Sequence, residues 1–192
     1  MTPPVSLALG AEGTFVARTI DSDRKHLTAV LSAAAAHRGT SFVEIYQNCP
    51  IFNDGAFDAI NNQDTKADAI IPLEHGEPIR FGQPGEDGKG DKGLVRAASG
   101  GVEVALVSEV GEDALLVHDA HNEDPSTAFA ISRLTDSGYL NQSPIGIFRQ
   151  VERSTYDDQA RAQIATASSA APESPQDRLA GLIGGGDTWT VV

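Results

Sequence analysis

The stretch that decides the fold runs from residue 14 to residue 46 and reads TFVARTIDSDRKHLTAVLSAAAAHRGTSFVEIY. It opens with a short apolar run, Thr14–Ala17, which favours a buried strand. It closes with Ser41–Tyr46, which is rich in strand-forming residues. Between them, residues 22–38 predict a helix, because apolar side chains recur at the helical spacing: Leu27, Val30, Leu31 and Ala34. A strand–helix–strand unit of this length predicts two parallel strands in one sheet.

The ends of the predicted helix carry their own signals. Asp21 or Ser22 is expected to cap its N-terminus, since both side chains accept hydrogen bonds from free backbone N–H groups. His37 and Arg38 fall in its last turn and Gly39 follows, which is a typical stop. We expect the apolar stripe to pack on the sheet.

The rest of the chain predicts shorter elements. A turn is expected at 53–55 and one or two helical turns at 56–61. Extended pieces are expected at 69–73 and 78–81, a glycine-rich surface loop at 82–93, and a strand at 102–110 with 115–117 as its neighbour. Asp124-Pro125 predicts the entry to a helix of about ten residues. A strand at 144–151, a helix at 156–167, a linker at 168–175 and a helix at 176–183 complete the chain.

Composition excludes several classes of protein. The chain has 192 residues, and 27 acidic against 14 basic residues give a net charge of −13. Nucleic-acid binding needs a basic stripe, and the sequence has none. The single cysteine cannot form an internal disulfide. The N-terminus lacks the basic segment of a signal peptide, and no apolar run approaches the roughly 20 residues of a membrane span. We therefore expect a cytoplasmic protein.

Two polar stretches fail as binding motifs or leave alternatives open. The loop around Gly88-Lys89 lacks the first glycine of a phosphate-binding loop and the acidic residues of a calcium loop. The segment Val117–Asp124, which contains His118 and His121, allows either a metal site or a polar turn before a helix. The turn is favoured, because Asp124 suits a helix cap.

Cys49 is the residue that leaves two interpretations open. A lone cysteine after a strand is most often a small apolar residue of the core. Cys49, however, follows the carboxyl end of a predicted parallel strand, where open α/β sheets place their ligands. The proline after it also gives a rigid turn that can project the thiol outward.

Longer stretches resemble a known family. The run from Leu7 to Arg18 (LALGAEGTFVAR) is similar to the segment just after the thiamine-diphosphate motif in β subunits of 2-oxoacid:ferredoxin oxidoreductases. Three further motifs follow in the same order and at the same distances as in the family: Lys25-His26-Leu27, His37-Arg38-Gly39 and Cys49-Pro50-Ile51-Phe52-Asn53. The chain also resembles the later part of the subunit at His75-Gly76, Phe81-Gly82 and Pro144-Ile145-Gly146-Ile147-Phe148. The sequence resembles the 2-oxoglutarate type of this family more closely than the pyruvate type.

The resemblance implies a fold and an activity. The fold is α/β, a partial thiamine-diphosphate-binding fold with a parallel sheet, followed by a C-terminal α+β extension. The family converts a 2-oxoacid and coenzyme A to acyl-CoA and CO₂ and passes electrons through a [4Fe–4S] cluster to ferredoxin. A cysteine at the position of Cys49 is one of four cluster ligands there, and no other residue of this chain is implied as a catalytic or cofactor-binding residue.

The sequence also departs from the family. The other three cluster cysteines and the Gly-Asp-Gly motif for diphosphate and Mg²⁺ belong to the N-terminal half, and this chain has neither. We therefore expect a C-terminal half that is not a competent enzyme and binds no cofactor by itself. Its expected partners are the missing half of the β subunit, the α subunit and ferredoxin. Parallel strands need cover on both faces, and the helices over the second face are expected in the missing half. We therefore expect an exposed apolar face or edge beside the first strand. A truncated gene, a mispredicted start and a split subunit stay open as origins.

Three parts are expected within the chain: 1–68 from the thiamine-diphosphate-binding domain, 69–167 as the extension, and 168–192 as a linker, a short helix and a tail. Two alternative functions remain, a non-catalytic docking module and a decayed fragment.

Overall fold

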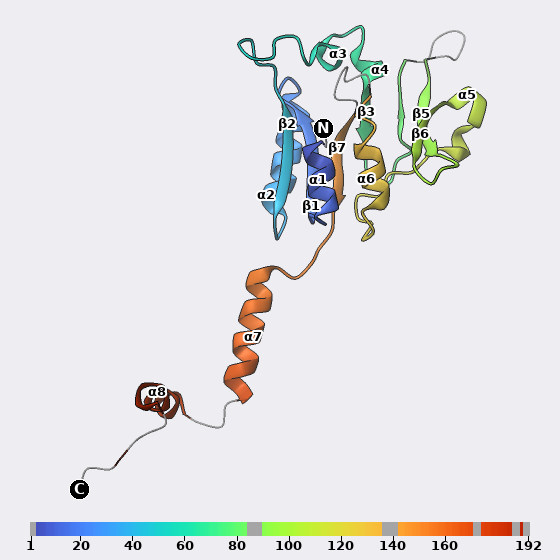
Figure 1. The fold of residues 1–192 in the computed structure, drawn as a ribbon. Coiled ribbons are helices and arrows are strands. Elements are labelled where there is room, and N and C mark those ends of the chain that lie inside the picture. The colour runs from blue at the N-terminus through green and yellow to red at the C-terminus, as the bar shows by residue number, and fades with distance from the viewer. Residues whose placement is uncertain (1–2, 84–89, 136–141, 171–173, 186–188, 190–192) are drawn as a thin grey trace. The chain divides into compact units, whose positions relative to one another are not determined.

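The computed structural model describes residues 3–83, 90–135, 142–170, 174–185 and 189 (Figure 1). The chain divides into two compact units, Met1–Arg153 and Ser154–Val192. The division into 1–68, 69–167 and 168–192 that the sequence predicts concerns the parts of the family's subunit, and it stays a prediction.

The predicted strand–helix–strand unit is confirmed. Strand β1 (Phe15–Ile20) and strand β2 (Ser41–Tyr46) pair in parallel, from Phe15 opposite Ser41 to Ile20 opposite Tyr46. Helix α2 (Arg24–Ala36) connects them. The predicted cap was wrong by one or two residues. The side chain of Asp23, not that of Asp21 or Ser22, accepts a hydrogen bond from the His26 N–H at 3.0 Å.

The apolar stripe of α2 packs on the sheet only in part. Val30 is buried, and Ala34 packs beside it against Phe15 and Ala17 of β1. Leu31, by contrast, is 43% exposed, so its predicted place in the core was wrong. The reason is helical geometry, because the contact face is centred on Val30 and the residues three and four positions later. Leu31 lies one residue, about 100°, away from that centre.

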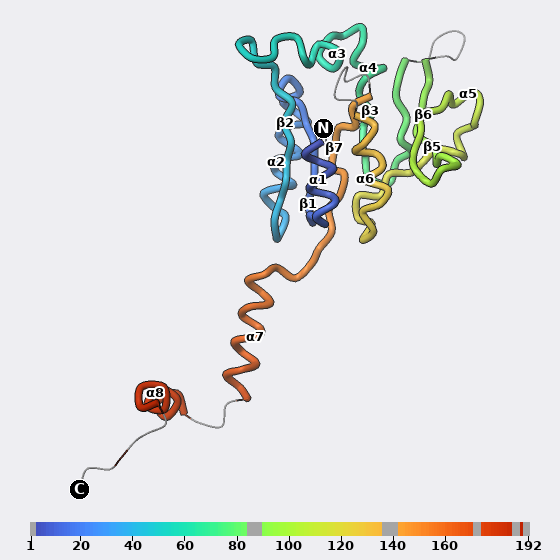
Figure 2. The backbone as a smooth tube through the Cα atoms, viewed as in Figure 1, coloured from blue at the N-terminus to red at the C-terminus, as the bar shows by residue number. Residues whose placement is uncertain are grey.

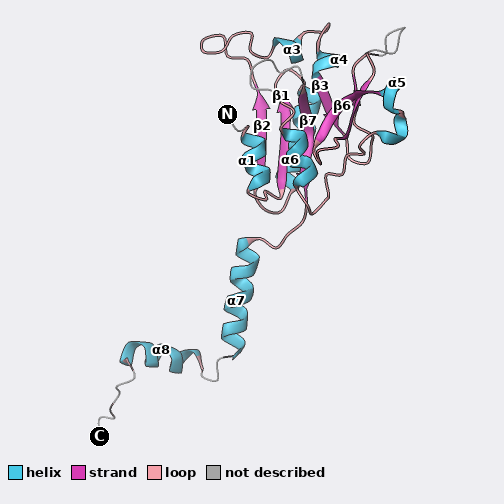
Figure 3. Ribbon diagram, turned by 45° about the vertical axis from the view of Figure 1, so that its right-hand side comes forward, coloured by secondary structure: helices cyan, strands magenta, loops and turns pink. Residues whose placement is uncertain are grey.

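The main sheet has four strands in the order β2-β1-β7-β3 (Figures 1 and 3). Strand β7 (Ser143–Gln150), predicted from the sequence, runs antiparallel to β1 and parallel to β3 (Ile70–Leu73). The exposed edge that we expected beside β1 is therefore not there, because β7 occupies it. Among the described strands of this sheet, β2 pairs on one side only, with β1, and is therefore an edge strand.

Helices cover both faces of this sheet. On one face lies α2, whose Val30 packs with Phe15 and Ala17 of β1. On the other face lie α1 (Pro4–Gly10) and α6 (Ser126–Ser132), which Figure 3 shows in front of the sheet. Val5 and Leu9 of α1 form one core cluster with Val16 and Phe148 from the sheet. The expectation that the covering helices belong to a missing half was wrong, and α1 was not predicted. Its apolar run is short, so its periodicity gave no helical signal.

A second, smaller sheet has the antiparallel order β4-β5-β6, formed by Arg80–Phe81, Lys92–Arg96 and Val102–Leu106. The strand predicted over 102–110 ends at Leu106, where helix α5 (Val107–Val110) begins, followed by a 3₁₀ turn at Glu112–Ala114. The segment 115–117 does not pair with β6 as expected. Instead, the N–H of Leu116 donates to the carbonyl of Leu94 in β5, at 2.7 Å.

The segment between β2 and β3 contains two short helices, α3 (Asp58–Asn61) and α4 (Lys66–Ala69), which Figure 2 traces along one end of the sheet. The first agrees with the helical turns predicted at 56–61. The turn before it is confirmed by Gly55, whose φ of 74° favours glycine. Of the loop predicted at 82–93, residues 84–89 lie outside the described residues, and its last two residues belong to β5.

The second unit contains α7 (Tyr156–Ala170) and α8 (Pro175–Gly184). Both helices were predicted, although α7 extends three residues into the predicted linker, of which 171–173 lie outside the described residues. Ser174 caps α8, and Gly185 ends it in a left-handed conformation. Within the described parts of the chain, no helix has the length and the apolar character that crossing a bilayer requires.

Candidate functional site

Cys49 lies on a loop at the carboxyl end of β2, the strand at the sheet's edge. It follows three residues after the last residue of the strand, as the sequence predicted, and it is half-buried. Its neighbours Ile51 and Phe52 are 84% and 90% exposed. None of the core clusters formed by described residues contains Cys49. The interpretation of Cys49 as a core residue is therefore not supported.

The Cys49 loop, residues 47–55, is held by hydrogen bonds within itself. The N–H of Asn53 donates to the Cys49 carbonyl at 2.9 Å. The side chain of Asn48 makes two further bonds: its amide nitrogen donates to Asp54 Oδ1 at 2.9 Å, and its oxygen accepts from the Gly55 N–H at 3.1 Å. Asn48 thus ties both ends of the loop together, a role that the sequence analysis missed.

Backbone groups of this loop stabilise a thiolate. The backbone N–H groups of Phe52, and then of Ile51 and Asn53, hold the pKa of Cys49 below its ordinary value, against an opposing effect of burial. Backbone N–H groups close to a sulfur favour its charged form. Because the thiolate is the form that binds metals and acts as a nucleophile, Cys49 is suited to either role.

By itself, the chain does not fit an iron–sulfur cluster or thiamine diphosphate. Cysteine thiolates hold a [4Fe–4S] cluster at four positions, and the sequence contains one cysteine. No three His, Cys, Asp or Glu side chains among the described residues are arranged to hold a metal ion. The sequence also lacks the Gly-Asp-Gly motif for the diphosphate. The loop offers one metal ligand, the thiolate of Cys49.

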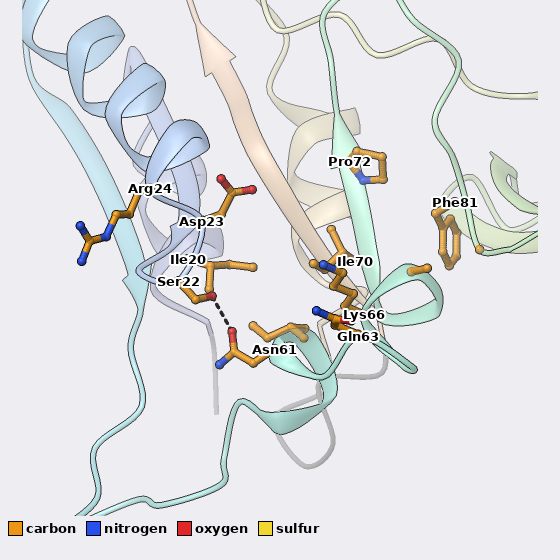
Figure 4. Close-up of a pocket in the computed structure, with 13 residues that line it drawn as sticks. Ile20, Ser22, Asp23, Arg24, Asn61, Gln63, Lys66, Ile70, Pro72 and Phe81 are labelled. Atoms are coloured by element: carbon orange, nitrogen blue, oxygen red, sulfur yellow. Dashed lines mark hydrogen bonds between the residues drawn. The ribbon is translucent and has the colours of Figure 1, made fainter.

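A cavity of about 620 Å³ lies at the carboxyl end of β1, and the sequence did not predict it (Figure 4). One wall comes from the loop into α2, with Ser22 and Asp23. The opposite wall comes from the α3–α4 segment, with Asn61 and Lys66. The Ser22 hydroxyl donates to Asn61 Oδ1 at 2.6 Å and joins the two walls. The short helices gave no periodic signal, so only the tertiary fold brings these polar groups together.

The histidines at 118 and 121 form a polar turn. His118 is buried, and its Nε2 lies 2.7 Å from the Ile147 carbonyl of β7. His121 Nδ1 lies 2.6 Å from the Gln150 carbonyl. Asp124 Oδ1 accepts from the Ser126 N–H at 2.9 Å, next to the start of α6. These bonds to the backbone support the turn rather than the metal site.

Arg18, which the sequence analysis also missed, is wholly buried in the middle of β1. Its Nε donates to Glu44 of β2 at 2.6 Å, and its Nη1 donates to Thr135 at 2.8 Å. The ring of Tyr46 lies 4.9 Å from the guanidinium carbon, and burial raises the pKa of that tyrosine to about 12. Arg18 therefore links β1 to β2, the strand that leads into the Cys49 loop.

Comparison with known proteins gives the relationship. The chain is 52% identical over 188 residues to the 2-oxoglutarate oxidoreductase subunit KorB of Mycobacterium tuberculosis, a match that covers 98% of this chain and 48% of that protein. The chain is related to the β subunits of 2-oxoacid:ferredoxin oxidoreductases. The resemblance predicted from the sequence, to the 2-oxoglutarate type, is therefore confirmed.

Other β subunits of this family match a shorter stretch. The 2-oxoacid:ferredoxin oxidoreductase subunit beta of Saccharolobus solfataricus is 39% identical over 51 residues, which cover 27% of this chain and 17% of that protein. A comparison with models of protein families finds no match. The chain spans about half the length of the Mycobacterium tuberculosis subunit that it matches.

A solved structure shows the same fold. The 2-oxoglutarate:ferredoxin oxidoreductase from Magnetococcus marinus, determined with 2-oxoglutarate, coenzyme A and succinyl-CoA bound, superposes with a TM-score of 0.53 at 19% identity. The match covers 95% of this chain and 44% of that chain. The α/β class predicted from the sequence is confirmed, with a mixed sheet in which β2 pairs with β1, and β3 with β7, in parallel.

Proposed function

We propose that this chain is a portion of the β subunit of a 2-oxoacid:ferredoxin oxidoreductase that acts on 2-oxoglutarate, and that Cys49 is one of four thiolate ligands of its [4Fe–4S] cluster. One observation carries the role of Cys49. Its thiol lies on a loop at the carboxyl end of the edge strand β2, between exposed neighbours, and backbone N–H groups of residues 51–53 lower its pKa. The 52% identity to a 2-oxoglutarate oxidoreductase subunit supports the substrate.

In the complete enzyme, thiamine diphosphate with Mg²⁺ would supply the decarboxylation chemistry and the cluster would carry electrons to ferredoxin. The contribution of this chain is to hold one corner of the cluster. Asn48 fixes the loop, and the N–H groups of residues 51–53 stabilise negative charge on the ligating sulfur. Hydrogen bonds to sulfur and exposure to solvent are among the factors that set the reduction potential of such clusters.

The proposal includes three partners: the remaining half of the β subunit, the α subunit and ferredoxin. The edge of β2 is the place where we expect the remaining half to add. It presents unpaired backbone groups among the described residues, and all six of its residues are half-buried or exposed. Since Cys49 lies three residues after the end of this strand, a partner that pairs there would bring its own cysteines close to Cys49.

The test is reconstitution. The chain alone, purified and treated with iron and sulfide, is expected to bind neither a cluster nor thiamine diphosphate, as measured by iron and sulfide content and visible absorption. Fused to the N-terminal half of a related β subunit and assembled with an α subunit, it is expected to reduce ferredoxin with 2-oxoglutarate and coenzyme A.

Cys49→Ala in that assembly should abolish ferredoxin reduction, whereas decarboxylation of 2-oxoglutarate should partly survive. Ile51→Ala, an exposed neighbour that leaves the thiol intact, serves as the matched control and should retain turnover. Full ferredoxin turnover by the Cys49→Ala assembly would rule out the ligand role. A stoichiometric cluster on the chain alone would contradict the proposal that the chain is incomplete.

A further inference from the structure

A small cavity of about 70 Å³ lies between the 116–124 segment, α6 and β7, and no residue of the Cys49 loop lines it. At one end its lining side chains are buried, among them Ile131 of α6 with Phe148 and Arg149 of β7. At the other end they are exposed, as Arg96 and Asn122 are. Because one ordered water needs roughly 10–15 Å³ of such space, the cavity has room for a small molecule of several heavy atoms.

Arg149 brings a positive charge to the buried end, and its side chain is 1% exposed. Its Nη1 donates to the carbonyls of Glu12 and Gly13 at 3.1 and 2.9 Å, and its Nη2 to the carbonyl of Glu123 at 2.7 Å. These three acceptors are neutral. The ion pair with Glu123 is long, 3.9 Å from Nη2 to Oε2, and that carboxylate also pairs with Arg153 at 3.0 Å.

The Nε–H of Arg149 has no acceptor among the described residues, although the nitrogen is buried. Buried polar groups are nearly always hydrogen-bonded, and an unpaired donor on a charged group is especially unfavourable. Since Nη1 and Nη2 are already used, Nε is the atom of this guanidinium that remains to bind an occupant of the cavity. An acceptor with a negative charge would satisfy both the donor and the buried charge.

Side chains nearer to solvent offer further donors. The side-chain oxygen of Asn122 accepts from the Asp124 N–H at 2.9 Å, which leaves its amide nitrogen to donate. Thr127 Oγ1 accepts from Arg96 Nη2 at 3.3 Å, so the hydroxyl keeps its own proton to donate. All three of Arg96, Asn122 and Thr127 line the cavity. The donors therefore come from β5, α6 and the segment before α6, and they suit an acceptor with two oxygen atoms.

Two carboxylates also line the cavity, and they limit the charge of an occupant. Asp119 Oδ1 accepts from the His121 N–H at 2.9 Å, and Asp124 Oδ1 accepts from the Ser126 N–H at 2.9 Å. The Asp119 side chain is 53% exposed and Asp124 is exposed as well, so solvent screens both charges, whereas the charge of Arg149 is out of water. One negative charge is therefore favoured at the buried end, and a second would be opposed by the two acids.

We propose that this cavity binds a small carboxylate with a single negative charge, of about the size of acetate. One oxygen of the carboxylate accepts from the Nε–H of Arg149. The other accepts from Arg96 and from the amide nitrogen of Asn122. The short apolar end of the ligand contacts Ile131 and Phe148. The site is independent of Cys49 and of the activity proposed above, so the two proposals fail separately.

The test is a titration of the full chain with sodium acetate, with sodium chloride at equal ionic strength as the reference and sodium sulfate as the doubly charged comparison. Binding is followed by the ¹⁵N–¹H resonance of Arg149 Nε and by the melting temperature. Acetate is expected to shift the resonance in a saturable way and to raise the melting temperature, because a ligand that binds the folded state stabilises it. Chloride and sulfate are expected to do neither.

Arg96→Gln should weaken acetate binding about tenfold, the factor expected for one charge-assisted hydrogen bond. Asn122→Ala should weaken it about threefold, because a neutral donor contributes less. Arg133→Gln is the matched control. Arg133 is also exposed, at the end of α6, and it does not line the cavity, so the loss of its charge should leave binding unchanged.

Three results would overturn the proposal. An Arg149 Nε resonance that responds equally to acetate and chloride would show that the cavity holds only water. Equal weakening by Arg96→Gln and Arg133→Gln would show that acetate responds to the overall charge of the chain and not to this site. Sulfate binding as tight as acetate binding would contradict the preference for a single negative charge.

Discussion

Strands β1 and β2 lie side by side and have similar sequences, FVARTI and SFVEIY, yet their surroundings are opposite. All six residues of β1 are buried, with a partner strand on each side and helices over both faces. All six residues of β2 are half-buried or exposed. The difference shows that position in the sheet, and not strand composition, decides burial. The fully buried strand, β1, is therefore not the strand that leads into the Cys49 loop, β2.

The largest expected effect comes from truncating matched aromatic residues in the two strands. Phe15 of β1 is wholly buried against Val30 of α2, whereas Phe42 of β2 is half-buried. Phe15→Ala should lower the free energy of unfolding by about 4 kcal/mol, since it leaves a cavity in a closed core. Phe42→Ala should cost about 1–2 kcal/mol. Urea unfolding followed by circular dichroism measures both, and equal losses would contradict the comparison.

A somewhat smaller effect is expected at the ion pair that joins the two strands. Arg18→Met leaves Glu44, which is 16% exposed, without its partner and should cost about 3 kcal/mol. Adding Glu44→Gln to that variant removes the unpaired charge and should recover part of the loss. The same denaturation experiment on the two single variants and the double variant gives the coupling. If the double variant loses as much as the sum of the singles, the pair does not link β1 to β2.

Lowering the pH should weaken the contact between His118 and β7, which pairs with one side of β1. His118 supports β7 through the Ile147 carbonyl, and burial lowers its pKa below the ordinary 6.5. A lowered pKa means that its contribution is fully present above pH 6.5 and is lost as pH falls through the folded-state pKa. Stability measured between pH 7.5 and pH 5 should therefore decrease, and His118→Gln should flatten the slope. An unchanged slope in that variant would show that His118 does not contribute.

The smallest effect on stability is expected at the Cys49 loop, where the change should appear in reactivity instead. Asn48→Ala removes two hydrogen bonds of an exposed loop and should cost about 1 kcal/mol or less. Because the loop then no longer holds its N–H groups toward the sulfur, the pKa of Cys49 should rise and its alkylation by iodoacetamide at pH 7.5 should slow. Alkylation at an unchanged rate would show that Asn48 does not organise the loop.

The sequence predicted those elements whose signals are local. The spacing of Leu27, Val30 and Ala34 identified α2, and the strand-forming runs identified β1, β2 and β7. It also placed Cys49 after the carboxyl end of a parallel strand. Family membership was readable for a similar reason, since it rests on the order and spacing of short motifs such as Cys49-Pro50-Ile51-Phe52-Asn53.

Only the tertiary structure decided which strand became the edge. β7 lies more than 120 residues after β1 in the sequence and pairs with it in the antiparallel sense. No local pattern encodes such a pairing, because it depends on which exposed strand a distant segment reaches. The bond from Arg18 to Thr135 and the contact of His118 with the Ile147 carbonyl of β7 have the same origin. Residue types and spacings are properties of the chain, whereas burial and hydrogen-bond partners are set when distant segments pack together.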